Sequence, residues 1–80
     1  MSNILDLEPD NKTKLALLSQ EVNMLINTRW QLQMRHRVNK SIGADKTVLD
    51  SIEAELVKCE QYLARLDDEA QALSKERRST

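Results

Sequence analysis

The sequence predicts an all-α fold, an antiparallel coiled-coil αα-hairpin of two long helices that dimerises into a four-helix bundle. In the second half of the chain, apolar residues recur at alternating spacings of three and four, the pattern of a coiled-coil helix. The 80 residues include one glycine, one proline and few aromatic residues, whereas sheets are rich in aromatic residues and are punctuated by Gly and Pro turns. The one glycine, Gly43, stands near the middle of the chain, where a hairpin would turn.

The first helix is predicted to cover residues from about 10 to 41, after a flexible leader at residues 1–9. The leader lacks the basic start and the apolar core of a signal peptide. Pro9 suits the first turn of a helix; alternatively, Asp10 or Asn11 provides the N-cap, and Pro9 lies just outside the helix. The seam of this helix is the column of residues expected to face the other helix. Its apolar members are Leu15, Leu18, Val22, Leu25 and Leu32, and the same spacing also falls on Arg29, His36 and Asn39.

The connection is predicted at residues 42–45. A glycine just past a helix end takes the left-handed conformation that closes the last turn, and Gly43 stands at that point. Asp45 and Thr47 are both good N-caps for the next helix. A short connection makes the helices antiparallel neighbours within a single domain, residues 10–78. Two alternatives stay open: one continuous helix, because the apolar phase continues across Gly43, and a domain-swapped hairpin.

The second helix is predicted at about residues 46–77. Nearly all the residues that flank its seam are acidic, so this helix would repel a copy of itself. Lys75, Arg77 and Arg78 in its last turn have the charge that the helix dipole favours there. The seam of this helix comprises Leu49, Ile52, Leu56, Cys59, Leu63, Leu66, Ala70 and Leu73.

The two predicted helices carry opposite charge. Residues 29–46 contain five basic residues and one acid, a net charge of +4, and residues 47–74 contain two basic residues and seven acids, a net charge of −5. Because flanking charges select partners in coiled coils, the first helix is the expected partner of the second. Each exposed pair contributes only about 0–1 kcal/mol, so charge chooses the partner more than it stabilises the fold. The expected neighbours are Arg37 with Asp50 and Arg35 with Glu53.

The first helix has more apolar residues than one seam needs. A second stripe recurs at every fourth residue and consists of Ile26, Trp30, Met34 and Val38. We expect this stripe to form a second interface, either with another copy of the chain in a homodimer or higher oligomer, or with a larger protein. Trp30 is the expected anchor, since Trp dominates the energetics of many interfaces. The alternative is one wide, drifting stripe that packs entirely on the second helix.

The sequence contains no recognisable catalytic or metal-binding pattern, and we expect no cofactor. The one histidine, His36, stands between two arginines and is expected at the surface or in the seam. Arg29 opposite Glu53 or Glu60 would be the nucleus of any site in a bundle core, or else a semi-buried ion pair. The one cysteine, Cys59, is expected to be a small buried hydrophobe.

The composition favours a cytoplasmic protein. The longest uninterrupted apolar run, Leu15 to Leu18, is far shorter than the roughly 20 residues that span a bilayer. A lone free thiol suits a reducing compartment. The acidic second helix argues against binding to a membrane surface, because helices that bind there carry Lys and Arg on their polar face.

These features predict a protein–protein interaction module, a small adaptor, assembly factor or inhibitor, that acts through a self-associating helical hairpin. Its small size suggests a viral or mobile-element origin. The alternative is a hairpin dimer that binds RNA or DNA through the basic residues Arg29, Arg35, Arg37 and Lys40. The net charge of −1 weighs against this alternative, because nucleic-acid binders usually carry a strong basic excess.

Overall fold

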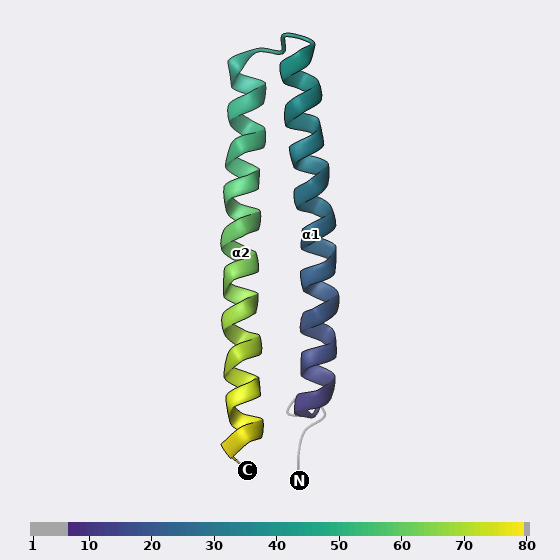
Figure 1. Ribbon diagram of the computed structural model, residues 1–80, viewed down its shortest axis with the longest axis vertical. Helices are drawn as coiled ribbons and strands as arrows, with labels where there is room; N and C mark the ends of the chain where they lie inside the picture. The colour runs from purple at the N-terminus through teal and green to yellow at the C-terminus, as the bar shows by residue number, and fades with distance from the viewer. Residues whose placement is uncertain (1–6, 80) are drawn as a thin grey trace.

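The computed structural model is a hairpin of two antiparallel helices that pack side by side (Figure 1). Helix α1 spans Asn11–Ser41 and helix α2 spans Lys46–Ser79. The all-α hairpin predicted from the sequence is confirmed. The alternative of one continuous helix is wrong, because the chain reverses direction at the turn that contains Gly43.

The structure describes the backbone of residues 7–79 and the side chains of residues 7–75. Most of the expected leader, residues 1–6, lies outside this part, and so do the side chains of Arg77 and Arg78 that were expected to favour the end of the second helix. Among the described residues, no helical stretch combines the length and the hydropathy that crossing a membrane requires.

Asp10 caps the start of α1. Its backbone is extended, with φ −69° and ψ 170°, and its Oδ1 accepts a hydrogen bond of 2.8 Å from the backbone N–H of Thr13. Hydrogen bonds from the side chain and then the backbone of Thr13 hold the pKa of the Asp10 carboxyl below its ordinary value. Glu8, which precedes the helix, accepts a hydrogen bond of 2.9 Å from Nζ of Lys14 in α1. This bond, and then the charge of the ammonium, lower the pKa of Glu8.

The turn closes α1 with a left-handed glycine. Gly43 has φ +74°, a conformation that residues with a Cβ rarely adopt. Its N–H donates to the carbonyl of Lys40 at 3.2 Å, and the N–H of Ala44 donates to the carbonyl of Asn39 at 2.9 Å. These two bonds satisfy carbonyls that the end of a helix leaves open, in the arrangement of a Schellman motif. The Asp45 carbonyl then accepts hydrogen bonds from the N–H groups of Val48 and Leu49, near the start of α2.

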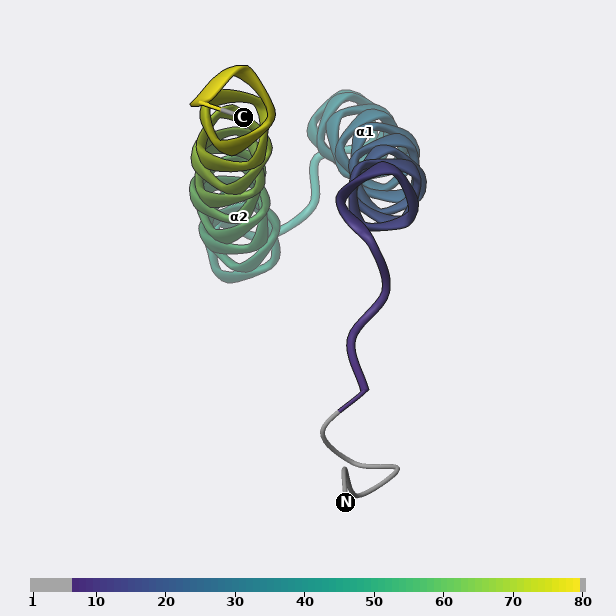
Figure 2. The same cartoon turned by 90° about the horizontal axis from the view of Figure 1, so that it is seen from below.

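The core is a single line of side chains between the two helices. Leu32 and Cys59 are its most buried members among the described residues, each 6% exposed. Viewed along its length, the molecule is a layer only one helix thick, open to solvent on both faces (Figure 2). The seam residues around these two are half-buried: Leu15, Leu18, Val22, Leu25, Arg29, His36 and Asn39 on α1, and Leu49, Ile52, Leu56, Leu63, Leu66, Ala70 and Leu73 on α2.

Candidate interaction surfaces

The second apolar stripe of α1 is open to solvent. Ile26 is 42% exposed, Trp30 56%, Met34 37% and Val38 52%. The alternative in which one wide stripe packs entirely on the other helix is therefore wrong, because α2 leaves all four side chains accessible. An isolated exposed apolar residue is ordinary on a protein surface, but a run of four on one helix is a candidate interface.

The stripe winds around α1 and does not lie on one flat face. Four residues of an α-helix turn about 40° more than one full revolution, so each member of the stripe is rotated from the one before. Ile26 and Trp30 share the side of α1 that carries Gln33 and Arg37, which follow at helical spacings of three and seven. Val38 has turned toward the opposite side. The sequence pattern identified the residues of the stripe but not this division.

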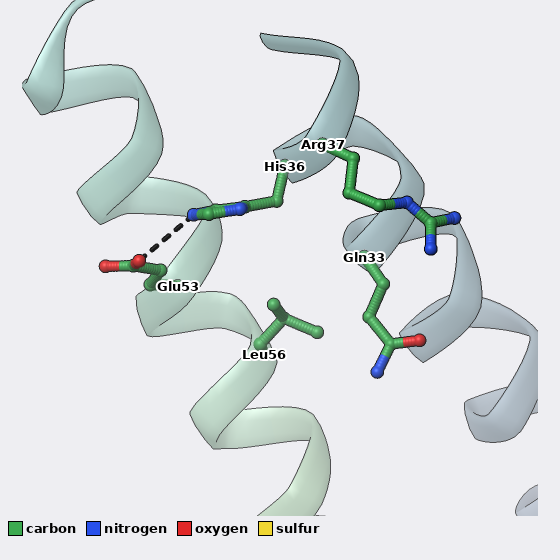
Figure 3. Close-up of a pocket in the computed structure, with 5 residues that line it drawn as sticks. All are labelled: Gln33, His36, Arg37, Glu53 and Leu56. Carbon is green, nitrogen blue, oxygen red and sulfur yellow. Dashed lines mark hydrogen bonds and ion pairs between the residues drawn. The ribbon is translucent and has the colours of Figure 1, made fainter. Parts of the chain in front are cut away.

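The hairpin consequently has two different faces. We call the first the Trp30 face. A shallow groove on this face is lined by Gln33, His36, Arg37, Glu53 and Leu56 (Figure 3). The seven-residue repeat of each helix places further residues on the same face, above and below the groove. The face comprises Ile26, Trp30, Gln33, Arg37 and Lys40 of α1 and Asp50, Glu53, Val57, Glu60, Ala64 and Asp67 of α2.

His36 and Glu53 join the helices across this groove. Nε2 of His36 lies 3.0 Å from Oε1 of Glu53, with side chains that are 24% and 57% exposed (Figure 3). The expectation that Arg35 would lie beside Glu53 is not met by an ion pair: among the described residues, Glu53 is paired with His36. The histidine holds a seam position and so reaches across, whereas Arg35 stands on the flank. The sequence placed His36 in the seam or at the surface but did not identify its partner.

Charge is segregated on the Trp30 face. Its α1 side carries the basic residues Arg37 and Lys40 and, between Val22 and Ser41, no acid. The other two basic residues of this stretch, Arg29 and Arg35, lie outside the face. On α2 the face carries four carboxylates, at Asp50, Glu53, Glu60 and Asp67, and no basic residue between the first and the last of them. Arg37 and Asp50 are both exposed, and no ion pair joins them to each other or to another described residue. The face is thus basic and apolar along α1 and acidic along α2.

The opposite surface, which we call the Tyr62 face, has mixed charge. Two hollows on it are lined by described residues that include Leu17 and Glu21 of α1 and Tyr62 and Glu69 of α2. Glu21 and Glu69 line the same hollow together with Lys14, so its charge is mixed. The α2 side of this face carries both acidic and basic residues: Glu55, Lys58 and Glu69 line the hollows, and the seven-residue repeat adds Arg65.

The thiol of Cys59 is held inside the hairpin. Sγ donates a hydrogen bond of 3.4 Å to the backbone carbonyl of Leu25, and the residue is buried. A thiol in this position acts as a small core side chain with a weak donor. Within the described part of the chain, no group of three His, Cys, Asp or Glu side chains is arranged to hold a metal ion.

The structure does not gather the basic stretch into one patch. Arg29 is half-buried in the seam, and no ion pair connects it to Glu53 or Glu60 in the described part of the chain. Helical spacing places Arg37 and Lys40 on the Trp30 face and Arg35 toward the Tyr62 face. The semi-buried ion pair between Arg29 and Glu53 or Glu60, the arrangement from which any site in a bundle core would have started, is therefore not formed among the described residues.

Comparison of the chain with protein-family models, with curated proteins and with solved structures found no match.

Proposed function

We propose that this chain is a protein–protein interaction module, a small adaptor, assembly factor or inhibitor, that works as a self-associating helical hairpin. Two hairpins pair into a four-helix bundle, which presents a helical surface to a larger partner. The observation that carries the proposal is the exposed apolar stripe Ile26, Trp30, Met34 and Val38 on a hairpin whose own core is one side chain wide.

The surface area of the chain supports association. The single chain exposes 6769 Å², whereas a compact monomer of 9.2 kDa would expose only about 4,900 Å². Part of this excess follows from the elongated shape, with extents of 60 × 28 × 15 Å. The excess is nevertheless larger than the ~800 Å² that each partner buries in a standard protein interface. A second hairpin would bury a usual interface area and cover one open side of the seam.

Trp30 is the expected anchor of the interface. Its side chain is large and more than half exposed, and it lies 11 residues before the end of α1, well away from the turn. Buried Trp side chains often carry a large share of binding free energy, because they remove much apolar surface from water. The half-buried seam residues on either side of it would gain further cover from the same contact.

Thermal unfolding at two concentrations that differ a hundredfold tests this proposal. If the dimer is the folded form, Tm rises with concentration, because association stabilises only the folded chain. Trp30→Ala should weaken this dependence strongly. Met24→Ala is the matched control, since Met24 is an apolar residue of α1 that is even more exposed than Trp30 and lies outside the stripe. A Tm of the unmodified chain that does not change with concentration would refute self-association.

Binding of RNA or DNA is a second candidate. It is favoured by the absence of any acid between Val22 and Ser41, a stretch that carries four basic residues. Their distribution over different sides of α1, and the acids of the neighbouring α2, make it the weaker proposal. A gel shift at low salt that disappears steeply as salt rises would support it. No shift with duplex or single-stranded RNA or DNA would remove it.

A further inference from the structure

We infer that the Trp30 face binds the Trp30 face of a second copy, with both turns at the same end of the dimer and each α1 packed on α2 of the partner copy. The inference rests on the self-association proposed above. It adds the face, the orientation and the register of the contact.

Charge selects the Trp30 face over the Tyr62 face. On the Trp30 face, the acid-free side of α1 lies next to a side of α2 that carries four carboxylates. Such a face is complementary to its own copy when α1 meets α2. The Tyr62 face offers no equivalent, because basic and acidic residues are mixed along its α2 side, and the hollow with Glu21 and Glu69 also contains Lys14. Complementary potentials favour association, whereas like charges in contact cost several kcal/mol.

Charge also selects the orientation. Two identical faces can meet through a twofold axis perpendicular to the helices, which sets α1 on α1 and α2 on α2. In that arrangement the carboxylates of α2 face their own copies. With the axis parallel to the helices, each α1 lies on α2 of the partner copy, and the two turns lie together. Only the second arrangement places the basic side of α1 against the acids of α2.

The parallel axis also fixes the register, because it leaves the height of each residue along the bundle unchanged. Trp30 lies 11 residues before Ser41, and Val57 lies 11 residues after Lys46, so the two are level in the hairpin. Trp30 therefore meets Val57 of the partner copy, and both side chains are more than half exposed in the single chain.

The same count makes Arg37 level with Asp50. Arg37 lies four residues before Ser41 and Asp50 four residues after Lys46. Each dimer then contains two Arg37–Asp50 pairs between copies, in addition to two contacts between Trp30 and Val57. Neither side chain has an ion-pair partner among the described residues of the single chain, so both are available. Met34 and Val38 turn away from this contact and stay accessible to a larger partner.

A distance between spin labels near the turn tests the orientation. Lys46 is exposed at the start of α2, and Lys46→Cys in a Cys59→Ser background provides one labelling site per chain. Turns at the same end give a separation of roughly 15–30 Å, because neighbouring helix axes lie about 8–10 Å apart. Turns at opposite ends give a separation close to the 60 Å length of the hairpin. Circular dichroism of the labelled chain confirms that it keeps its helices.

A charge-swap mixture tests the register. Arg37→Asp alone and Asp50→Arg alone each place like charges at both contacts, and we expect each to raise the dimer dissociation constant at least roughly tenfold. Mixed together, the two variants restore two opposite-charge contacts between copies, while the repulsion within each hairpin stays. A heterodimer that forms at least roughly tenfold more tightly than either homodimer supports the inference.

The outcomes separate the inference from the proposed function. Short label distances together with a preferred heterodimer support the inference. A dimer with long distances, or a mixture that pairs statistically, overturns the inference and leaves self-association standing. A chain that gives no intermolecular distance at any concentration overturns self-association, and the inference with it.

Discussion

Nε2 of His36 lies 3.0 Å from Oε1 of Glu53 and ties α1 to α2, five residues before the end of α1 and seven residues after the start of α2. Together with the bond from the Cys59 thiol to the Leu25 carbonyl, it is a polar contact between helices in a hairpin that otherwise depends on apolar packing. Both partners are partly exposed, so solvent screens the interaction. The pair fixes the relative position of the helices more than it stabilises them.

A double-mutant cycle with His36→Ala and Glu53→Ala measures this pair. We expect a coupling free energy below about 1 kcal/mol, because exposed ion pairs and hydrogen bonds exchange with water at little net gain. Urea unfolding at one fixed protein concentration gives the four free energies. Glu55→Ala, at an exposed acid with no described ion pair, is the control and should show no coupling with His36→Ala. A coupling above about 2 kcal/mol would contradict the view of a screened pair.

Leu32 is the side chain whose truncation should cost most. Leu32→Ala removes a buried side chain and should lower the free energy of unfolding by about 2–3 kcal/mol. Leu17→Ala, at a half-exposed leucine of the same helix, should change it by less than about 1 kcal/mol. Urea unfolding compares the two. Equal losses would mean that the line of side chains between the helices is not the core.

Gly43 should tolerate no ordinary side chain without cost, although there is room for one. No atom lies within 4 Å of a Cβ placed there, so the penalty of Gly43→Ala comes from the positive φ alone. We expect a loss of about 1 kcal/mol, and a smaller loss for Gly43→Asn, because Asn adopts the left-handed conformation more readily. Chemical unfolding of both variants checks the order. An alanine as stable as glycine would show that the turn does not need this conformation.

The start of α1 should fray in acid. The folded-state pKa values of Glu8 and Asp10 are both lowered, so their stabilising contribution is present above the unfolded values of 4.5 and 3.8. It is lost as the pH falls through the lower folded-state values. The protection of the Thr13 and Lys14 amides, measured relative to their intrinsic exchange rates, should therefore fall below about pH 4. Asp10→Asn is the control, because Asn keeps the cap without titrating; the same loss of protection in this variant would exclude Asp10 as its cause.

Much of the fold follows from local signals. The helix ends depend on single residues, Asp10 and Gly43, whose chemistry is visible in the sequence. The seam follows from a spacing that repeats along each helix. Arg29 and His36 are polar, but they hold seam positions and are half-buried like the apolar members.

The contacts across the turn could not be predicted in the same way. Glu53 stands 17 residues from His36, and the sequence favoured Arg35 as its partner because basic and acidic stretches were matched only approximately. Choosing between two neighbouring residues requires the rotation of each helix about its own axis. The rotation of successive residues about the α1 axis also divides the stripe. Ile26 and Val38 both belong to the series of every fourth residue, but they lie on different faces of the hairpin.

Sedimentation equilibrium of the unmodified chain from about 10 to 500 μM is the most direct measurement of self-association. If hairpins pair through the Trp30 face, the mass rises with concentration toward twice the 9.2 kDa of one chain, and Trp30→Ala shifts this rise to higher concentration by more than roughly tenfold. A helical chain that keeps a mass of 9.2 kDa over the whole range would contradict self-association.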